Sequence, residues 1–171
     1  MTAAADLSVG DLAARLRRME DVEAIRTLDA VYCRLLDDGD WPGLVELFTP
    51  DGCFDGLSVV TGRAELLAFF GGLADAGLTA FWHHVSNLEV TVDGDTAAVT
   101  SLLWQPCVVD GVAQVAAGRY ADRLVRTAAG WRYALKQVRF AYWVPLAEGW
   151  DQHRFALEAA RSAPLPRGGR A

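Results

Sequence analysis

Four long β-strand candidates follow one another in the second half of the chain, and this feature limits the possible folds more than any other. All four contain many β-branched or aromatic residues, as strands do, and they span residues 81–92, 96–109, 112–125 and 131–144. Asp93-Gly94-Asp95, Asp110-Gly111 and Ala128-Ala129-Gly130 separate them, and such sequences are typical of hairpin turns. The pattern predicts an antiparallel meander.

The first part of the chain has helical periodicity instead. An amphipathic helix is predicted over residues 6–20, with Ser8 and Asp11 placed as a capping box. A second and stronger helix is predicted over residues 21–38, ending at Gly39. Its apolar stripe consists of Val22, Ile25, Leu28, Tyr32, Leu35 and Leu36.

Shorter elements are predicted between these helices and the meander. We expect a brief helix at residues 41–48, a turn at 49–52, short strands at 53–54 and 57–60, and a third helix at 64–74. Helices followed by a meander predict an α+β domain whose helices cover one face of a bent sheet. We expect one domain over residues 1–150, then a C-terminal helical extension with a disordered tail over 151–171.

Composition and charge exclude several classes of function. The chain has 171 residues and a net charge of -6, so it offers no basic field for nucleic acid or an anionic membrane. No apolar run is long enough to cross a bilayer, and the first residues do not resemble a secretory signal. Three widely spaced cysteines fit neither a disulfide framework nor a zinc site. These features favour a cytoplasmic location.

Two adjacent histidines stand out within residues 79–92, TAFWHHVSNLEVTV. Neighbouring residues on a strand point to opposite faces, so one of His83 and His84 should point into the core and the other outward. An inward histidine is either a structural residue or a proton-transfer group. His153 is the only other histidine, and we expect no metal site.

Two carboxylates lie near the buried face of the second predicted helix, and the one at its end could partner that histidine. Asp29 lies close to the apolar stripe, so it must be paired or lie at the edge of the buried face. Asp37 lies off the stripe, but it falls in the last turn, where a side chain can turn back towards a cavity. An aspartate bonded to one ring nitrogen fixes the tautomer and stabilises the imidazolium. Because no serine or cysteine nucleophile is evident, such a pair would move protons rather than transfer acyl groups.

Other candidate binding residues are aromatic or charged. An apolar cavity or ordinary packing would both account for Trp41, Trp82, Trp104, Tyr120, Tyr142 and Trp143. Lys136 and Arg139 on the last strand are either solvated or positioned to hold an anion. A reactive thiol at Cys53 or Cys107 is a further option, although no activating base lies nearby in the sequence.

Several local strings, in their order and spacing, resemble the SnoaL-like branch of the nuclear transport factor 2-like superfamily. The likeness covers about residues 20–146 and rests on the strings AIRTLDAVYCRLLDDGDWPGLVELF, HHVSN, DGDTAAV, GRYADRLVRTAAGWRY and YWVPL. The superfamily includes scytalone dehydratase, hexachlorocyclohexane dehydrochlorinase and SnoaL-type polyketide cyclases. The resemblance implies a cone-shaped, cystatin-like barrel with helices packed on a strongly bent, mostly antiparallel sheet.

The resemblance also implies a site. The dehydratases and the dehydrochlorinase of this group use an Asp–His dyad at the mouth of the cavity, and by position these residues fall on Asp37 and His83. Tyr32 falls where the dehydrochlorinase has a polar pocket residue. Lys136 falls near its pocket arginine, although the residue type differs at both positions.

Two features of these relatives have no counterpart in this sequence. The second histidine of scytalone dehydratase is missing, and Trp104 and Gln105 occupy that region. The acid that holds the oxyanion in ketosteroid isomerase is also missing. The same fold hosts enzymes, binding modules and structural subunits, so function does not follow from fold alone.

The sequence therefore leads to one principal expectation and one alternative. The first is a lyase or isomerase, without cofactor or metal, that acts on a small hydrophobic cyclic molecule. His83 would take a proton from carbon, Asp37 would orient His83, and Tyr32, Lys136 or Arg139 would bind the developing oxyanion or the leaving group. The alternative is a non-catalytic ligand-binding or assembly module. An exposed apolar sheet face would favour a homodimer or homotrimer.

Overall fold

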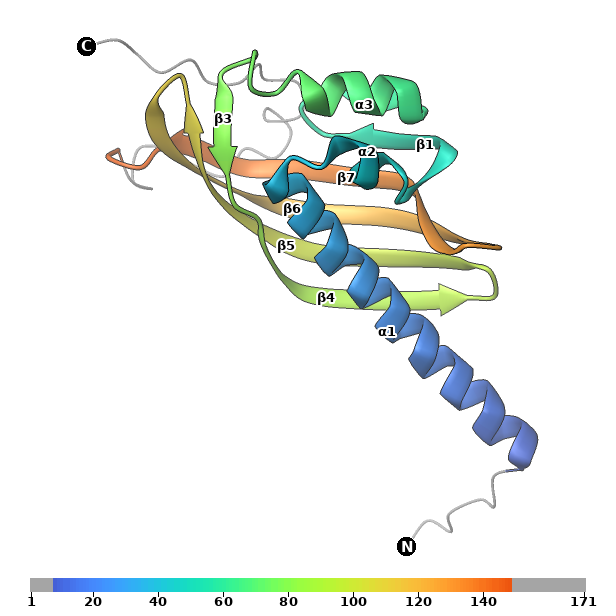
Figure 1. The fold of residues 1–171 in the computed structure, drawn as a ribbon. Helices are drawn as coiled ribbons and strands as arrows, with labels where there is room; N and C mark the ends of the chain where they lie inside the picture. Colours follow the sequence, from blue (N-terminus) through green and yellow to red (C-terminus); the bar gives the residue numbers. More distant parts are fainter. Residues whose placement is uncertain (1–7, 149–171) are drawn as a thin grey trace, which may run out of the picture.

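A long helix lies across a strongly curled, half-barrel sheet (Figure 1). The computed structural model describes residues 8–148. Its helices are α1 (Val9–Asp38), α2 (Trp41–Val45) and α3 (Arg63–Gly71). Its strands are β1 (Phe48–Asp55), β2 (Val59–Thr61), β3 (Leu78–Phe81), β4 (His84–Asp93), β5 (Thr96–Val109), β6 (Val112–Thr127) and β7 (Gly130–Pro145). The predicted α+β class is confirmed. The predicted extension, 151–171, lies outside the described residues.

Helix α1 is continuous, so the prediction of two separate helices was wrong. The Ser8–Asp11 capping box is present at its start, and Gly39 ends it in the left-handed conformation with φ of 71°. The two predicted halves carry apolar residues on different sides, since Leu16 is exposed and Ile25 is buried. Because the apolar side of the helix changes, the sequence resembled two separate helices. Neither glycine nor proline, however, interrupts the backbone where the two predicted segments meet.

The meander is confirmed for β5, β6 and β7, which pair antiparallel over almost their full lengths. The first predicted strand, residues 81–92, is instead divided into β3 and β4. Both pair with β5, β3 near its end and β4 along the rest. Trp82 and His83 lie between these two strands, and this interruption creates the candidate site described below.

Strand β1 makes the sheet mixed, because it pairs in parallel with the last strand, β7. The strand order is β2-β1-β7-β6-β5-β3, with β4 also on β5. The turn predicted at residues 49–52 was wrong, since these residues lie within β1 at a shift of register. Gly52 explains the irregularity, because a Cβ there would lie 2.8 Å from the backbone oxygen of Tyr133.

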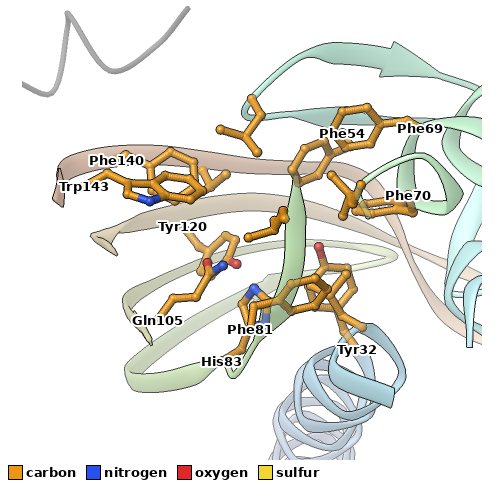
Figure 2. Close-up of a pocket in the computed structure, with 15 residues that line it drawn as sticks. Tyr32, Phe54, Phe69, Phe70, Phe81, His83, Gln105, Tyr120, Phe140 and Trp143 are labelled. Atoms are coloured by element: carbon orange, nitrogen blue, oxygen red, sulfur yellow. The ribbon is translucent and has the colours of Figure 1, made fainter. Parts of the chain in front are cut away.

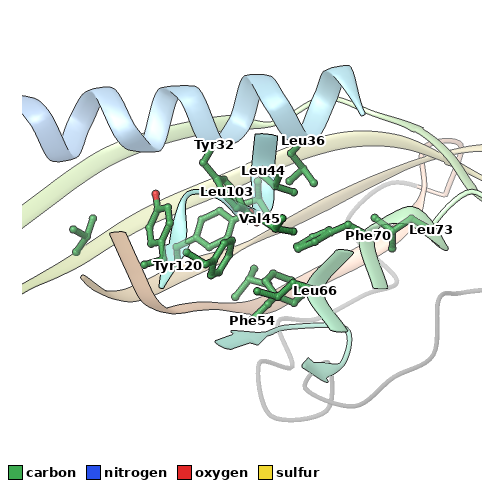
Figure 3. Packing of buried hydrophobic residues seen from close by; sticks show 14 of the residues in the cluster. Tyr32, Leu36, Leu44, Val45, Phe54, Leu66, Phe70, Leu73, Leu103 and Tyr120 are labelled. Atoms are coloured by element: carbon green, nitrogen blue, oxygen red, sulfur yellow. The ribbon is translucent and has the colours of Figure 1, made fainter. Parts of the chain in front are cut away.

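Apolar side chains from all three helices fill the hollow of the sheet (Figure 3). Tyr32 on α1 contacts Phe48 and Tyr133 edge to face, with ring centroids 6.3 and 5.5 Å apart. Phe54 on β1 packs against Phe70 on α3. Burial of this apolar surface is the main stabilising contribution to the fold.

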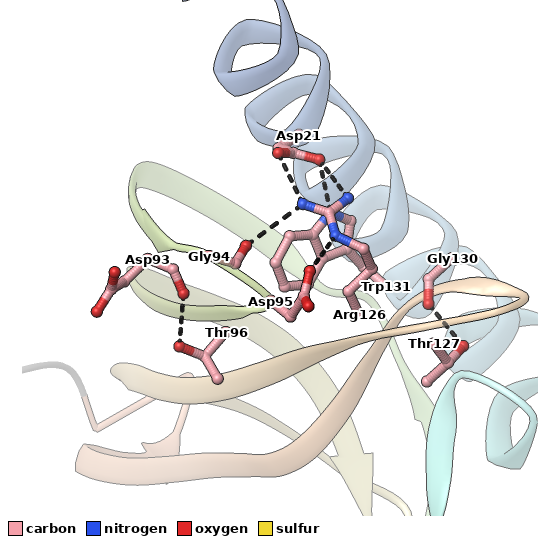
Figure 4. A network of polar contacts seen from close by, with 9 residues as sticks. All are labelled: Asp21, Asp93, Gly94, Asp95, Thr96, Arg126, Thr127, Gly130 and Trp131. Atoms are coloured by element: carbon pink, nitrogen blue, oxygen red, sulfur yellow. Dashed lines mark hydrogen bonds and ion pairs between the residues drawn. The ribbon is translucent and has the colours of Figure 1, made fainter. Parts of the chain in front are cut away.

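Arg126 on β6 fixes the point where α1 leaves the sheet (Figure 4). Its guanidinium donates two hydrogen bonds to Asp21, at 2.6 and 2.8 Å, and one to Asp95, at 2.9 Å. It also lies 4.5 Å from the ring centroid of Trp131. The bonds from Arg126 lower the pKa of the Asp21 carboxyl. Before Asp21, the helix projects beyond the sheet (Figure 1).

Candidate active site

The interruption between β3 and β4 brings His83 to the end of α1. The backbone N–H of His83 is not used in the ladder and donates instead to both carboxylate oxygens of Asp37, at 3.1 and 3.0 Å. The ring nitrogen Nδ1 lies 2.6 Å from Asp37 Oδ1. A single carboxylate therefore holds both the backbone and the ring of His83.

The position of Asp37 depends on the end of α1. Gly39 turns the chain away two residues later, so the last helical turn faces the start of β4. The side chains of Asp37 and His83 are 10% and 6% exposed, which shields their contact from water. A proton on Nδ1 satisfies the contact and leaves the lone pair of Nε2 free to accept a proton. Within residues 8–148, Nε2 makes no hydrogen bond.

A cavity lies beside His83, between α1 and the sheet (Figure 2). Aromatic and aliphatic side chains from helices and strands dominate its lining: Tyr32, Leu36, Phe54, Leu57, Phe69, Phe70, Leu73, Leu78, Phe81, His83, Gln105, Tyr120, Val138, Phe140 and Trp143. Its volume is about 40 Å³, counted as space open to the centre of a water molecule. That is room for a few water molecules, so a ring-sized ligand requires lining side chains to move aside.

Two tyrosines and one glutamine bring polar groups to this apolar lining. The hydroxyl of Tyr32 is buried and makes no hydrogen bond within the described part of the chain. Burial raises the pKa of Tyr32 and of Tyr120, so both hydroxyls stay protonated and can donate to a ligand. Gln105 reaches the same wall from β5 (Figure 2).

Lys136 lies behind this wall rather than in it. Its ammonium is fully buried and bonds Asp29 and Asp122, each at 2.8 Å. It also lies 4.6 Å from the ring centroid of Tyr32 and 4.1 Å from that of Tyr120. Of the two alternatives predicted for Asp29, pairing is the one observed. Lys136 does not line the cavity, because the two tyrosine rings do.

The cluster of Lys136, Asp29 and Asp122 has an excess of negative charge when all three groups are ionised, because two carboxylates share one ammonium. Burial raises the pKa of Asp122 to about 6, and the charge of Lys136 partly offsets this rise. Burial alone would lower the pKa of Lys136, but Asp122 and the other neighbours raise it well above its ordinary value. The cluster therefore binds an additional proton more readily than an isolated aspartate would.

Four other predicted binding residues also lie outside the cavity lining. Arg139 is bonded to Asp55 on β1, at 2.9 and 2.5 Å. Trp41 stacks on Phe70, with ring centroids 6.2 Å apart. Trp82, between β3 and β4, is 63% exposed, and Trp104, which alternates with inward neighbours on β5, is 39% exposed.

The predicted opposition of the two histidines is confirmed, because His83 points inward and His84 is exposed. A reactive thiol at Cys107 is disfavoured, since the residue is buried and burial raises the pKa of the thiol to about 11. Among residues 8–148, no three His, Cys, Asp or Glu side chains are grouped in a way that could hold a metal ion. No helix in the same range is long and apolar enough to cross a bilayer.

The sequence did not predict most of the aromatic residues that line the cavity. Phe54, Phe69, Phe81 and Phe140 come from four different elements, and no local pattern relates them. Gln105 was noticed only as the residue in the region of a missing histidine. Its alternation with exposed neighbours on β5 is a signal that could have placed it inside.

Comparison with known proteins agrees with this architecture. The SnoaL-like domain family matches residues 17–135. The uncharacterized protein Rv2910c of Mycobacterium tuberculosis is 31% identical over 131 residues, which cover 74% of this chain and 84% of that protein. An NTF2-like protein with a cystatin-like fold from Novosphingobium aromaticivorans is 35% identical, with a TM-score of 0.67 over 78% of this chain and 90% of that one.

A more distant structure has the same fold. Hexachlorocyclohexane dehydrochlorinase LinA-type3 from Novosphingobium barchaimii is 20% identical, with a TM-score of 0.71 over 78% of this chain and 94% of that one. The predicted resemblance and the cystatin-like fold are thus confirmed. The chain belongs to the family of SnoaL-like domains.

Proposed function

We propose that this protein is a lyase- or isomerase-type enzyme that acts on a small hydrophobic cyclic metabolite. In this proposal Asp37 and His83 form a proton-transfer dyad. The observation that supports it best is the 2.6 Å contact between Asp37 Oδ1 and His83 Nδ1 at the wall of an apolar cavity. A structure with the same fold is named as a dehydrochlorinase of hexachlorocyclohexane, which is a small apolar ring.

The first chemical step is removal of a proton from carbon. Nε2 of neutral His83 accepts the proton from a carbon next to a carbonyl or a leaving group. The imidazolium that results is stabilised by the carboxylate of Asp37, which holds the proton on Nδ1 throughout. The low exposure of both side chains strengthens this stabilisation, because little water competes for the charges.

Polar side chains in the cavity lining receive the negative charge that develops on the substrate. Tyr32 offers a buried hydroxyl that makes no bond within the described residues, so it can donate to an oxyanion without breaking an existing contact. Gln105 and Tyr120 line the same cavity and orient the ring. Elimination then expels a leaving group, whereas isomerisation returns the proton from Nε2 to another carbon.

The test uses the step that all of these reactions share. The protein is incubated in D₂O with a panel of cyclic ketones, and NMR follows the exchange of hydrogens next to the carbonyl. We expect His83→Ala to lower the exchange rate about a hundredfold or more, and Asp37→Asn to lower it strongly. His84→Ala is the matched control, because this neighbouring histidine is exposed. Folded His83→Ala protein with full exchange activity contradicts the proposal.

The low exposure of the His83 side chain, 6%, favours one alternative, a ligand-binding module without catalysis. About 40 Å³ leaves little room for a reacting ring unless the lining moves. Thermal-shift measurements with the same ketones distinguish the two functions. A ligand that stabilises the wild type and His83→Ala equally, with no exchange in either, supports the module. Stabilisation of both proteins, with exchange in the wild type alone, supports the enzyme.

A further inference from the structure

The projecting part of α1 carries an apolar stripe that no described residue covers. Val9, Leu12, Leu16 and Met19 are 83%, 52%, 57% and 68% exposed. Single exposed apolar residues are common on protein surfaces, but four aligned along one helix indicate an interaction site. The stripe lies in the part of α1 that extends past the sheet (Figure 1).

The spacing of these residues matches that of a coiled coil. Steps of three, four and three residues place Val9 and Leu16 at the a positions of a heptad and Leu12 and Met19 at the d positions. A valine at a and a leucine at d are compatible with two parallel strands. The partner that this stripe fits is therefore another helix with the same repeat.

The stripe also faces away from the body of its own molecule. Leu12 and Leu16 precede the buried Asp21 and Ile25 by nine residues, which is about two and a half helical turns. Residues at that separation lie on opposite sides of a helix. Two copies can therefore pair through the stripe while their sheets remain on the outer sides.

We propose that the occupant is a second copy of this chain, and that residues 9–20 of the two copies form a short parallel coiled coil. Charge complementarity supports this choice of partner and direction. Arg15 occupies a g position and Glu20 the following e position, so each Arg15 faces Glu20 of the second copy in a parallel pair. In an antiparallel pair centred on the stripe, Arg15 would lie near Arg15 instead.

The extent of the seam sets its strength. From Val9 to Met19 it measures about 15 Å. Glu23 and Arg26 take the next a and d positions and end it, because like charges would then face each other. A seam this short gives a weak dimer, although α1 is already ordered and held by Arg126, so pairing costs little conformational entropy.

Sedimentation velocity of the full chain over a range of concentrations tests the proposal. The wild type should shift from monomer to dimer as concentration rises. Leu16→Glu should remain monomeric with an unchanged melting temperature, because this side chain is exposed in the monomer. Ala14→Glu, on the same exposed stretch but outside the stripe, should dimerise like the wild type. A wild type that is monomeric at all concentrations, or a dimer insensitive to Leu16→Glu, overturns the proposal.

Charge reversal tests the parallel register. Arg15→Glu and Glu20→Arg should each weaken self-association, because each variant brings like charges together. A mixture of the two variants should form a heterodimer about as tight as the wild-type dimer, since both pairs are then opposite in sign. Arg18→Glu, on the other side of the helix, is the control. If self-association is not restored when the two variants are mixed, the parallel arrangement is overturned. In a separate experiment, binding of the monomeric wild type to anionic vesicles would overturn the proposal and identify a membrane surface as the occupant.

Discussion

Replacing Lys136 by methionine should destabilise this protein more than most single substitutions. The change keeps the volume of the side chain but removes the only ammonium between Asp29 and Asp122, both of which are buried. Removing one partner of a buried ion pair costs about 3–5 kcal/mol, because the remaining charge is left without compensation. For a chain of this length, 1 kcal/mol lowers the melting temperature by about 2–4 °C, so we expect a decrease of about 10 °C.

Urea unfolding at neutral pH, followed by tryptophan fluorescence, measures this change directly. The double variant Lys136→Met/Asp122→Asn should recover part of the lost stability, because it leaves one unpaired buried carboxylate instead of two. A Lys136→Met variant within about 1 kcal/mol of the wild type would contradict the reasoning, since that is within the usual range for point substitutions. A double variant that is less stable than Lys136→Met alone would also contradict the reasoning.

Two further predictions concern Asp122 of the same cluster and the neighbouring Tyr32. The pKa of Asp122 is about 6 against an ordinary 3.8, so its contribution to stability is complete below about pH 4 and is lost as pH rises through 6. In Asp122→Asn, the unfolding free energy measured from pH 4 to 7 should lack this decline, and an unchanged pH profile would contradict the assignment. Tyr32→Phe should leave the melting temperature unchanged or higher, because the hydroxyl has no partner within the described residues, yet it should slow proton exchange. Tyr133→Phe, which loses a 3.0 Å bond to Asp29, should lower the melting temperature, and equal melting temperatures for the two variants would count against this distinction.

Local patterns predicted those parts of the fold that have local causes. Alternation along β5, β6 and β7 follows directly from one buried and one exposed face, and hairpin turns fixed their order. Alternation also predicted that one of His83 and His84 faces inward and the other outward, while the resemblance indicated that the inward one is His83. Periodicity did not place Asp37 inside, and the resemblance was needed to single it out, because its position depends on the cap at Gly39 and on the interruption before β4.

Contacts between distant segments accounted for the errors. Lys136 was predicted to be solvated or to hold an anion, and its burial in an ion cluster was missed, since neither of the carboxylates bonded to it lies beside it in sequence. The division of residues 81–92 into two strands depends on where β5 is free to pair, which periodicity in those residues does not reveal. The turn predicted at residues 49–52 failed because proline and glycine also mark strand irregularities.

The parallel pairing of β1 with β7 has a consequence for the order of folding. Phe54 and Lys136 are neighbours in this ladder although most of the domain separates them along the chain, so their pairing closes a long loop and should form late. Phe54 and Val138, from these two strands, both line the cavity. A partly folded molecule with its hairpins and α1 in place would already hold Asp37 next to His83, but its chamber would remain open on one side. Ligand binding should therefore report completion of the last folding step.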